Sequence, residues 1–466
     1  IEQITGLQNL KKVFITPTFD ETLNNPSWLQ TAENEDAIIL QYTKDCVLDT
    51  NHKVNIYQSF MVKILKESGI EKYNEIDMGF MGSITSAKVI KENGTISSPE
   101  KSGNYVVVKN LEAGDIIQIE SHDVLEAQTI FGKNFNHQHF IFFPDPVFYS
   151  KFDFAVPKGS YLGYKTHKME KDPLKFTDSF NFDHYQWQNN NLAKIQNESA
   201  FPDYYDYYRS ISVSTLKDWE PVNNWYEETT YQKTELTYEI KEVLDTLVTP
   251  EMTDEQKIQK IYNYITTKIR YSFVAFLNTR FVPKWPGNTM SAGIGDCKDV
   301  ATLMISMLRS QNIECYYNLV KTTHFNHLET VPSLSFDHVI VCYILDGKKY
   351  YCDLTTNFYP LYVLPEMDND AIGLLIKKGE KETFHLPNDM MDIRKTSAKY
   401  AIDAELVDGR DIKLTVNAEY TGTAGGNLRE QIFRTSKNKY EDFMSQYFGQ
   451  DIFEDCLLYT SPSPRD

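Results

Sequence analysis

Short apolar runs broken by polar residues and turn signals fill the first half of the chain. Residues 37–42 (AIILQY) and 53–66 (KVNIYQSFMVKILK) are rich in residues that favour strands, and the apolar run at 140–143 is followed by two prolines. The pair Asn93-Gly94 separates two further strand candidates and is a strong signal for a hairpin turn. This pattern predicts that residues 1 to about 230 are mostly β-structure.

Helical spacing begins near residue 235. Thr253 and Gln256 fit a capping box that opens one helix, and apolar residues then follow one face of it. A second helix is predicted after Asp296 and must be buried along one side. Its apolar residues recur at helical spacing: Val300, Leu303, Met304, Met307 and Leu308.

Strand candidates follow this helix at 313–320, 336–344 and 349–354, and Asp346-Gly347 predicts a hairpin turn between the last two. After about residue 395 the β pattern resumes around Asp408-Gly409. Residues 428–448 are a final helix candidate. Strands and helices in separate runs favour an α+β fold.

Length and composition narrow the classes of function. A chain of 466 residues exceeds what one ordinary core holds, so two or three domains are expected. The net charge of −18 repels phosphate backbones, which argues against a nucleic-acid partner. No run of about 18 apolar residues is present, so no membrane span is expected. Six cysteines are too few for a disulfide scaffold. The sequence contains no CxxC pair, so a four-cysteine zinc site is not indicated.

Cys297 is the first candidate for chemistry. It lies in the sequence Gly-Asp-Cys-Lys-Asp at 295–299, where the buried helix is predicted to begin. The unpaired amides at a helix N-terminus favour a thiolate and can bind an oxyanion. A cysteine at this position is therefore predisposed to act as a nucleophile.

His338 and Asp353 are the second candidates, and the predicted hairpin places them together. If Leu345 pairs with Lys348 across the turn, His338 falls opposite Thr355, and Asp353 shares the face of His338. Such diagonal neighbours are about 7–8 Å apart at the backbone, which a His–Asp hydrogen bond can span. An imidazole held in this way can deprotonate a thiol and later protonate a leaving amine. Asp337 would point the other way.

A structural explanation of the same residues stays open at this point. A cysteine at a helix start is often a small core residue, and a His–Asp pair across a hairpin is often a satisfied polar contact. The sequence alone does not bring Cys297 and His338 together, because only the fold can do so.

Residues 236–376 resemble the bacterial transglutaminase-like core. The resemblance rests on GDCKD at 295–299 with its buried helix, FDHVIV at 336–341 and YYCDLTT at 350–356. It implies a papain-like α+β core with a Cys–His–Asp triad, in which Cys297 is the nucleophile, His338 the base and Asp353 the orienting residue. The family often has Asp-Pro-Thr where this chain has Asp-Leu-Thr, a difference that leaves the carboxylate in place.

The first 230 residues or so are similar, as a whole segment, to the β-rich domain of unknown function that precedes such cores in exported bacterial proteins. We therefore expect a papain-like transglutaminase core flanked by β-rich domains. The expected boundaries are 1–235 for the N-terminal domain, 236–395 for the core and 396–456 for the start of a C-terminal β-rich domain. Residues 457–466 (LLYTSPSPRD) resemble a translated sequencing adapter, so we expect a non-native tail there and a natural protein that continues past Cys456.

These features predict a cysteine-dependent enzyme that acts on amide bonds through a thioester, most simply a peptidase or amidase. The alternatives are cross-linking by transamidation of protein glutamines, or a non-catalytic binding or scaffold protein of the cell envelope. The expected substrate is a protein, a peptide or the peptide part of peptidoglycan, without any cofactor or metal, in the periplasm or outside the cell. The chain begins at Ile1, so a signal peptide would lie outside it.

Weaker signals are explained more simply by structure. His137 and His139 share a strand face as a possible metal pair, but no third ligand is evident. His324 and His327 fall in a loop before His338, where solvent exposure is the simpler expectation. The aromatic residues at 204–208 are expected to pack between domains, and Cys342 and Cys352 to lie in the sheet core.

Overall fold

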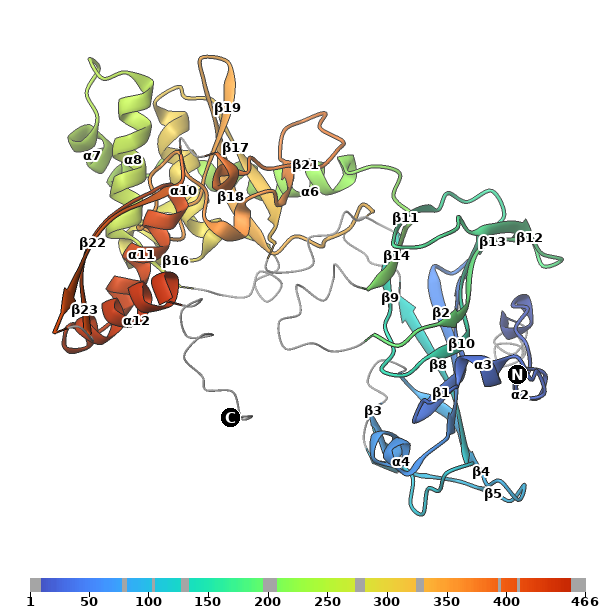
Figure 1. The fold of residues 1–466 in the computed structure, drawn as a ribbon. Coiled ribbons are helices and arrows are strands. Elements are labelled where there is room, and N and C mark those ends of the chain that lie inside the picture. The colour runs from blue at the N-terminus through green and yellow to red at the C-terminus, as the bar shows by residue number, and fades with distance from the viewer. Residues whose placement is uncertain are drawn as a thin grey trace. The chain divides into compact units, whose positions relative to one another are not determined.

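The structure is a computed structural model that describes residues 10–77, 82–102, 105–126, 134–195, 208–272, 281–323, 331–392, 395–408 and 411–453 (Figure 1). The described residues divide into two compact units. Unit 1 contains the chain up to Val222 together with 331–333, and unit 2 contains the remainder. Cys456 and the expected tail at 457–466 lie outside the described residues.

Unit 1 is built around an eight-stranded sheet with the order β12-β13-β10-β1-β2-β8-β4-β5. Its central strand β1 (Ala37–Leu48) pairs antiparallel with β2 (Lys53–Ile64) and parallel with β10 (Val147–Pro157). The other strands of this sheet are β4 (Ile84–Ile90), β5 (Ile96–Ser97), β8 (Ile116–Glu126), β12 (Leu174–Thr177) and β13 (Phe182–Leu192). The hairpin expected at Asn93-Gly94 is confirmed, since Val89 pairs with Ser97 and Gly94 has φ +82°.

Smaller elements complete unit 1. One three-stranded sheet has the order β11-β14-β9 and another the order β3-β7-β6. Their strands are β3 (Glu75–Asp77), β6 (Glu100–Ser102), β7 (Tyr105–Val107), β9 (Asn136–Ile141), β11 (Gly163–His167) and β14 (Arg209–Ser214). The helical segments are η1 (Lys11–Val13), α2 (Phe19–Leu23), α3 (Trp28–Thr31) and α4 (Glu67–Tyr73).

β1 is longer than the apolar run at 37–42 predicted. The strand continues through Thr43 and Asp45, which are buried although they are polar. Buried polar groups persist where partners satisfy them, and Lys151 provides one here: its Nζ lies 2.8 Å from Asp45 Oδ1. The hydrophobic pattern of the sequence stops at Tyr42 because beyond it the buried side chains of the sheet include the ion pair of Asp45 and Lys151.

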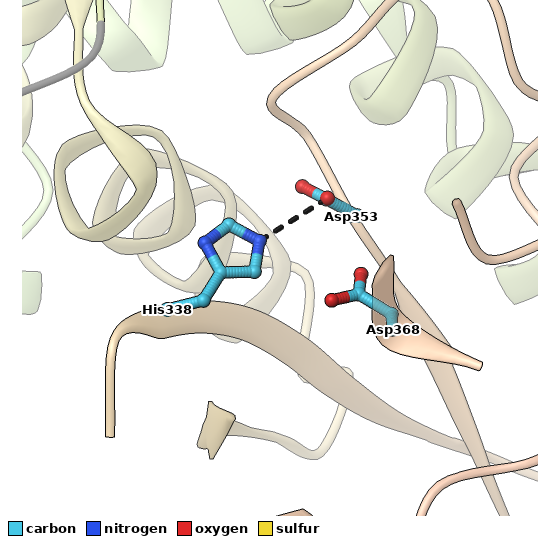
Figure 2. Close-up of side chains that lie close together, drawn as sticks. All are labelled: His338, Asp353 and Asp368. Atoms are coloured by element: carbon cyan, nitrogen blue, oxygen red, sulfur yellow. Dashed lines mark hydrogen bonds and ion pairs between the residues drawn. The ribbon is translucent and has the colours of Figure 1, made fainter. Parts of the chain in front are cut away.

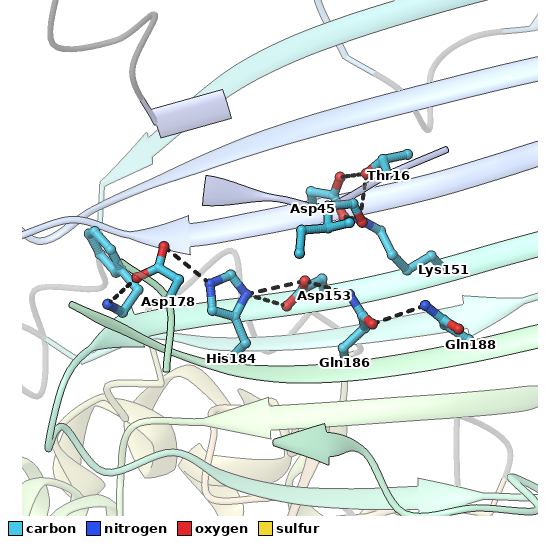
Figure 3. A network of polar contacts seen from close by, with 10 residues as sticks. Thr16, Asp45, Lys151, Asp153, Asp178, His184, Gln186 and Gln188 are labelled. Carbon is cyan, nitrogen blue, oxygen red and sulfur yellow. Dashed lines mark hydrogen bonds and ion pairs between the residues drawn. The ribbon is translucent and has the colours of Figure 1, made fainter. Parts of the chain in front are cut away.

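This ion pair belongs to a buried polar network on the sheet, shown in Figure 3. Lys151 also donates to the backbone oxygen of Ile15 at 3.0 Å and to Thr16 Oγ1 at 2.5 Å, which ties the N-terminal segment to the strand. Asp153, two residues further along β10, accepts from His184 Nδ1 at 3.0 Å and from Gln186 Nε2 at 3.0 Å. The network connects β1, β10 and β13 through largely buried charged and polar side chains.

Unit 2 carries the helices and a five-stranded sheet with the order β19-β18-β17-β20-β21. Its strands are β17 (Cys315–Lys321), β18 (His338–Leu345), β19 (Lys348–Cys352), β20 (Ile372–Leu375) and β21 (Phe384–His385), and a two-stranded sheet joins β15 (Arg270–Tyr271) to β16 (Ile294–Gly295). Its helices include α7 (Tyr238–Leu247), α8 (Asp254–Lys268), α9 (Pro286–Ala292) and α10 (Cys297–Ser310), with the short turns η2 (Gln232–Thr234), η4 (Glu366–Asp368) and η5 (Asp389–Met391).

The predictions for the central helices are confirmed in type and nearly in bounds. Thr253 and Gln256 form the expected capping box of α8, whose buried residues lie on one face. α10 differs from the prediction in burial: every residue from Cys297 to Leu308 is buried, not one side alone. The reason is that α10 contacts α8, α9, β17 and β18, so neighbours surround it. Because neighbours surround α10, the position of its first residue, Cys297, is held by this packing.

The short helices α2, α3, α4 and α9 were not predicted, and neither was a longer one. Residues 220–231 form α6 (Glu220–Tyr231), where the sequence suggested only a joining segment. Asn223 and Tyr226 are fully buried in unit 2, and Asn223 Nδ2 donates to the backbone oxygen of Leu375 at 2.7 Å. The helical signal was hidden because polar Asn223 and Thr230 occupy buried positions that usually carry apolar side chains.

The last described part of the chain forms a hairpin followed by two helices. β22 (Ser397–Val407) and β23 (Asp411–Thr421) pair along their whole length, around the expected Asp408 turn. The single helix predicted at 428–448 is wrong: α11 (Gly422–Arg434) and α12 (Tyr440–Phe453) are separated by η6 (Lys437–Lys439). The break occurs because the backbone becomes extended at Thr435 and Ser436. Within the described ranges, no helix is long and apolar enough to cross a membrane.

With 28% helix and 38% strand, the mixed α+β class is confirmed, as is a transglutaminase-like core flanked by β-rich regions. The core is the part of unit 2 that carries α8, α10 and the five-stranded sheet.

Candidate active site

Cys297 is the first residue of α10. The preceding Asp296 caps the helix: its Oδ1 accepts the amide of Asp299 at 3.2 Å, while Asp299 Oδ2 accepts the amide of Asp296 at 3.3 Å. Asp299 also accepts the backbone amide and the ammonium group of Lys284, each at 2.8 Å. These reciprocal bonds hold the turn that presents the Cys297 side chain.

The position of Cys297 has an electrostatic consequence. The amides of the first helical turn have no intrahelical acceptor, so the N-terminus of α10 carries partial positive charge. Only 4% of Cys297 is exposed to solvent, so this field acts on the sulfur with little screening by water. The same amides can donate to an oxyanion formed next to the sulfur.

His338 and Asp353 come from the hairpin of β18 and β19. The expected pairing of Leu345 with Lys348 is confirmed, and the turn residues Asp346 and Gly347 have φ values of 51° and 74°. Both values lie in the left-handed region that a two-residue hairpin turn requires. The ladder ends at Val341 and Cys352, so His338 and Asp353 lie beyond the last paired residues.

Figure 2 shows the contact between the two side chains. His338 Nε2 lies 3.2 Å from Asp353 Oδ2, and both residues are buried, with 4% and 2% exposure. Thr355 fixes the carboxylate through its backbone amide, 2.8 Å from Oδ1, and its hydroxyl, 2.9 Å from Oδ2. Thr355 thus holds the Asp353 carboxylate in place, and the same carboxylate contacts His338.

The charges of this pair support one another. Burial alone would lower the pKa of His338, but the charge and hydrogen bond of Asp353 outweigh it and raise that pKa well above its usual range. Burial would raise the pKa of Asp353, but the charge of His338 and the Thr355 donors lower it. The pair therefore favours imidazolium next to carboxylate.

The fold brings Cys297 to His338, which the sequence could not do. A hydrogen bond with the Cys297 side chain contributes to the raised pKa of His338. Since Nε2 faces Asp353, Nδ1 is the ring nitrogen left for the sulfur. Cys297, at the start of α10, and Asp353, after β19, therefore both influence the pKa of the His338 imidazole.

The other described cysteines lie in different surroundings. Burial raises the pKa of Cys46 and Cys342 to about 12 and that of Cys315 to about 11, and it raises the pKa of Cys352 well above its usual range. All five described cysteines are free of disulfides. Cys342 and Cys352 lie in the sheet core, as expected.

Asp337, the neighbour of His338, is turned away from the His338–Asp353 pair, as the alternation along the strand predicts. Its carboxylate accepts the backbone amide of Thr322 at 2.8 Å and the Thr322 hydroxyl at 2.6 Å. The choice of Asp353 over Asp337 as the partner of His338 therefore agrees with the observed contacts.

Asp368 is a site residue that the sequence gave no reason to select. It is the last residue of η4, it is fully buried, and Figure 2 shows its carboxyl group turned toward His338. Polar atoms of His338, Asp353 and Asp368 all lie within 4.8 Å of one another. Its position, 15 residues after Asp353 in an irregular segment, follows no strand or helix period.

These three residues are also the one group in the described ranges with the ligand types and spacing of a metal site. Two of them are already engaged with each other, because His338 Nε2 and both oxygens of Asp353 make the contacts given above. A cation would have to break the His338–Asp353 contact in order to bind. The contacts that these residues already make therefore fit a His–Asp pair better than a metal site.

The His137 and His139 pair proves to be an aromatic contact. His139 stacks on Phe152 with ring centroids 4.8 Å apart, and burial lowers the pKa of His139 well below its usual range and that of His137 to about 3. His324, His327 and the aromatic residues at 204–207 lie outside the described residues. Tyr208 stacks on Phe142 within unit 1, with centroids 4.4 Å apart.

Comparison with known families agrees with this geometry. Residues 241–348 match the family model of the Transglutaminase-like superfamily, and residues 101–196 match that of a Domain of Unknown Function with a solved structure, DUF3857. The chain therefore carries a transglutaminase-like domain preceded by a DUF3857 domain, which confirms both resemblances. No curated protein matches the chain.

Solved structures that match the chain include two bacterial proteins, of which only the first has a TM-score above 0.5. A "putative protease" from Parabacteroides distasonis ATCC 8503 shares 15% identity over 76% of this chain and 72% of its own, with a TM-score of 0.52. A "putative cysteine protease" from Cytophaga hutchinsonii shares 13% identity over 61% of this chain and 88% of its own, with a TM-score of 0.23. The first likeness concerns the fold alone. The match to the Transglutaminase-like superfamily supports a cysteine-dependent enzyme in the broad sense.

Proposed function

We propose that the protein breaks amide bonds by covalent catalysis, with Cys297 as nucleophile, His338 as general base and acid, and Asp353 as the orienting carboxylate. The observation that carries the proposal is the hydrogen bond of the buried His338 imidazole to Asp353, on a strand that packs against α10, the helix that begins at Cys297. An oriented imidazole next to a thiol at a helix N-terminus is the arrangement that activates a cysteine.

The chemistry follows from the positions of the protons. Cys297 gives its proton to His338, and the thiolate attacks the carbonyl carbon of the substrate amide. Asp353 stabilises the imidazolium, and the first-turn amides of α10 are the candidate donors to the oxyanion. The C–N bond then breaks, the imidazolium protonates the departing amine, and an acyl thioester remains on Cys297.

The acceptor decides the second half of the reaction. If water attacks the thioester, with His338 again taking a proton, the products are a carboxylic acid and the free thiol, so that the protein is a peptidase or amidase. If a primary amine attacks, a new amide forms and the protein is a transamidase. We favour hydrolysis, because water is the abundant acceptor and no site for a lysine side chain is evident among the described residues.

A peptide substrate with a glutamine amide tests both outcomes in one reaction. Full-length protein is incubated with the peptide, with or without a primary amine, and mass spectrometry distinguishes the acid from the new amide. Acid formation alone, absent in Cys297→Ala, supports a hydrolase, whereas amine incorporation supports the transamidase. A panel of peptides, proteins and peptidoglycan fragments then tests the substrate class.

The competing explanation is a binding or scaffold protein that keeps the fold without turnover. A thiol probe distinguishes the two explanations, because a scaffold has no need of a reactive cysteine. If native Cys297 reacts no faster than the other described cysteines and no panel substrate is turned over, the enzymatic proposal fails.

We also propose that the protein acts in the periplasm or outside the cell. The support is the similarity of its N-terminal part to domains that precede transglutaminase-like cores in exported bacterial proteins. Fractionation of cells that express the complete gene, followed by detection of the protein with an antibody, tests this location. Detection in the cytoplasm alone would contradict it.

A further inference from the structure

The Asp368 carboxyl group is buried without any conventional partner. No part of the residue is exposed to solvent, and neither carboxyl oxygen has a hydrogen-bond donor among the described residues. The backbone amide of Asp368 is satisfied by the oxygen of Pro365 at 3.1 Å, so only the side chain lacks a partner. An ionised carboxylate in such a place would lose its hydration without compensation.

The charged groups that face Asp368 make ionisation harder still. Asp353 and His338 come within 4.8 Å, and Asp337 adds a further negative charge from the start of the same hairpin. The one cation of the group, His338, directs Nε2 to Asp353 and shares a hydrogen bond with Cys297. No ring nitrogen therefore remains to donate to Asp368.

Two neighbouring buried carboxyl groups repel each other when both are ionised, so the arrangement is most stable when one of them is protonated. The donors decide which one. Asp353 accepts from the Thr355 amide, the Thr355 hydroxyl and His338, so it is the better carboxylate. Asp368 accepts from none of the described donors, so it is the carboxyl group that keeps the proton.

We propose that Asp368 is a carboxylic acid at neutral pH, and that its O–H group donates to Asp353 and positions the carboxylate that orients His338. This makes Asp368 a positioning residue for the triad, and that part of the inference rests on the proposed function. With the proton on Asp368, the pair of carboxyl groups carries one negative charge, which balances one imidazolium.

The acid–base properties of the group agree with this assignment. Burial raises the pKa of Asp368 well above its usual range, the charges of Asp353 and Asp337 raise it further, and the charge of His338 opposes them. The pKa of Asp353 is lowered instead, first by the charge of His338 and then by the hydrogen bonds from His338 and Thr355. A proton also satisfies Asp368 without disturbing the His338–Asp353 contact, which a bound cation would break.

Infrared spectroscopy of the full-length protein tests the proton directly. A buried protonated carboxyl group has a carbonyl stretch distinct from that of a carboxylate, and it shifts in D₂O. We expect this band at neutral pH in the wild type and in the control Asp370→Asn, whose side chain is exposed, and its loss in Asp368→Asn. Identical spectra in all three proteins would overturn the proposal, whether Asp368 is ionised beside water or beside a cation.

Alkylation of Cys297 by iodoacetamide tests the positioning role separately. Asp368→Leu removes the donor to Asp353, and we expect the rate constant to fall about two- to tenfold, the effect of one hydrogen bond. Asp368→Asn restores a donor from its amide and should recover part of the loss, whereas a purely space-filling role would favour Leu and Asn equally. Equal rates in the two variants would overturn the positioning role.

The two measurements separate this inference from the proposed function. A carboxylic acid band that disappears in Asp368→Asn supports the assigned proton even if Cys297 proves unreactive in every variant. In that case the proposed function fails and the assigned proton stands. If Cys297 is reactive but the carboxylic acid band is missing, the assigned proton fails and the proposed function stands.

Discussion

His338 Nε2 contacts Asp353 Oδ2 at 3.2 Å although neither residue belongs to a ladder pair of the hairpin. The last pair of that ladder is Val341 with Cys352, and the contact is made beyond it. What holds Asp353 in place is its own turn, through the amide and hydroxyl of Thr355. The orientation of the imidazole therefore depends on a side chain–backbone turn at the end of the strand.

The first prediction concerns this carboxylate. Asp353→Asn should keep the fold but lower turnover roughly 10³- to 10⁴-fold, because the amide cannot stabilise an imidazolium as a carboxylate does. Cys297→Ala and His338→Ala should abolish turnover. Rates on the best panel substrate, with melting temperatures as the control for folding, measure the effect. Unchanged turnover in Asp353→Asn would show that His338 does not act through Asp353.

The second prediction concerns thiol reactivity. Native Cys297 should react with iodoacetamide at pH 6–7 faster than any other described cysteine, because it lies between a helix N-terminus and an imidazolium. The raised pKa values of Cys46, Cys315 and Cys342 keep those groups as thiols. Peptide mapping after timed labelling gives the rate for each residue. His338→Ala should slow Cys297 alone, and equal labelling of all five described cysteines would contradict the assignment.

Local signals in the sequence were sufficient for one half of the site. Asp346-Gly347 determined the turn, the turn determined the register, and the register brought Asp353 to His338. The capping box of α8 was predictable for the same reason, since Thr253 and Gln256 interact within one helical turn. Both features depend on residues close together in the chain.

The other half depends on packing between distant segments. Cys297 meets His338 only because α10 lies against β17 and β18, and no sequence period encodes that contact. Asp368 reaches the triad from an irregular segment and was missed entirely. α6 was missed because its buried side chains include Asn223, whose partner is a backbone oxygen far along the chain.

The third prediction concerns the extent of the core. A fragment of residues 236–395 lacks α6, which buries Tyr226, and also lacks α11, whose Arg429 Nε donates to the backbone oxygen of Phe358 at 2.8 Å. We expect a fragment of residues 218–453 to melt cooperatively at a clearly higher temperature. In the full chain, Tyr226→Ala should cost about 3–5 kcal/mol, as for other large buried aromatics. Equal melting of the two fragments would show that α6 and α11 are not part of the core.

The fourth prediction concerns the polar network of unit 1. Lys151 is buried with its ammonium group 2.8 Å from Asp45, so Lys151→Met leaves a buried carboxylate without its cation. We expect a loss of about 3–5 kcal/mol in the free energy of unfolding. Denaturant unfolding measures it, with the exposed Lys12→Met as control. The double variant Lys151→Met/Asp45→Asn should regain part of the loss, and additive losses would contradict a pairing of the two groups.

The fifth prediction concerns the pH dependence of Asp45. Burial raises its pKa from 3.8 to about 6, although the charge of Lys151 opposes this. The folded state therefore binds more protons than the unfolded state between these values, and this group's contribution to stability is present at low pH and is lost as pH rises through about 6. The loss is at most about 1.4 kcal/mol per pH unit.

Asp45→Asn should remove this dependence. Relative to the wild type, the variant should become more stable as pH rises from about 4 to 6.5, a range that spans both pKa values, so its free energy of unfolding should increase relative to that of the wild type. The exposed variant Glu33→Gln serves as the control and should run parallel to the wild type. A constant difference between Asp45→Asn and the wild type across this range would mean that Asp45 titrates alike in both states.

The parallel pairing of β1 with β10 also sets the order in which unit 1 can form. Ile39 pairs with Val147 and Val47 with Ala155, so these two adjacent strands are separated in the chain by residues 49–146. A ribosome must therefore synthesise the chain through β10 before β1 gains its second neighbour, and until then one long apolar edge stays open. Folding of this unit should be slow, and a chaperone that covers β1 during synthesis should raise the yield of native protein.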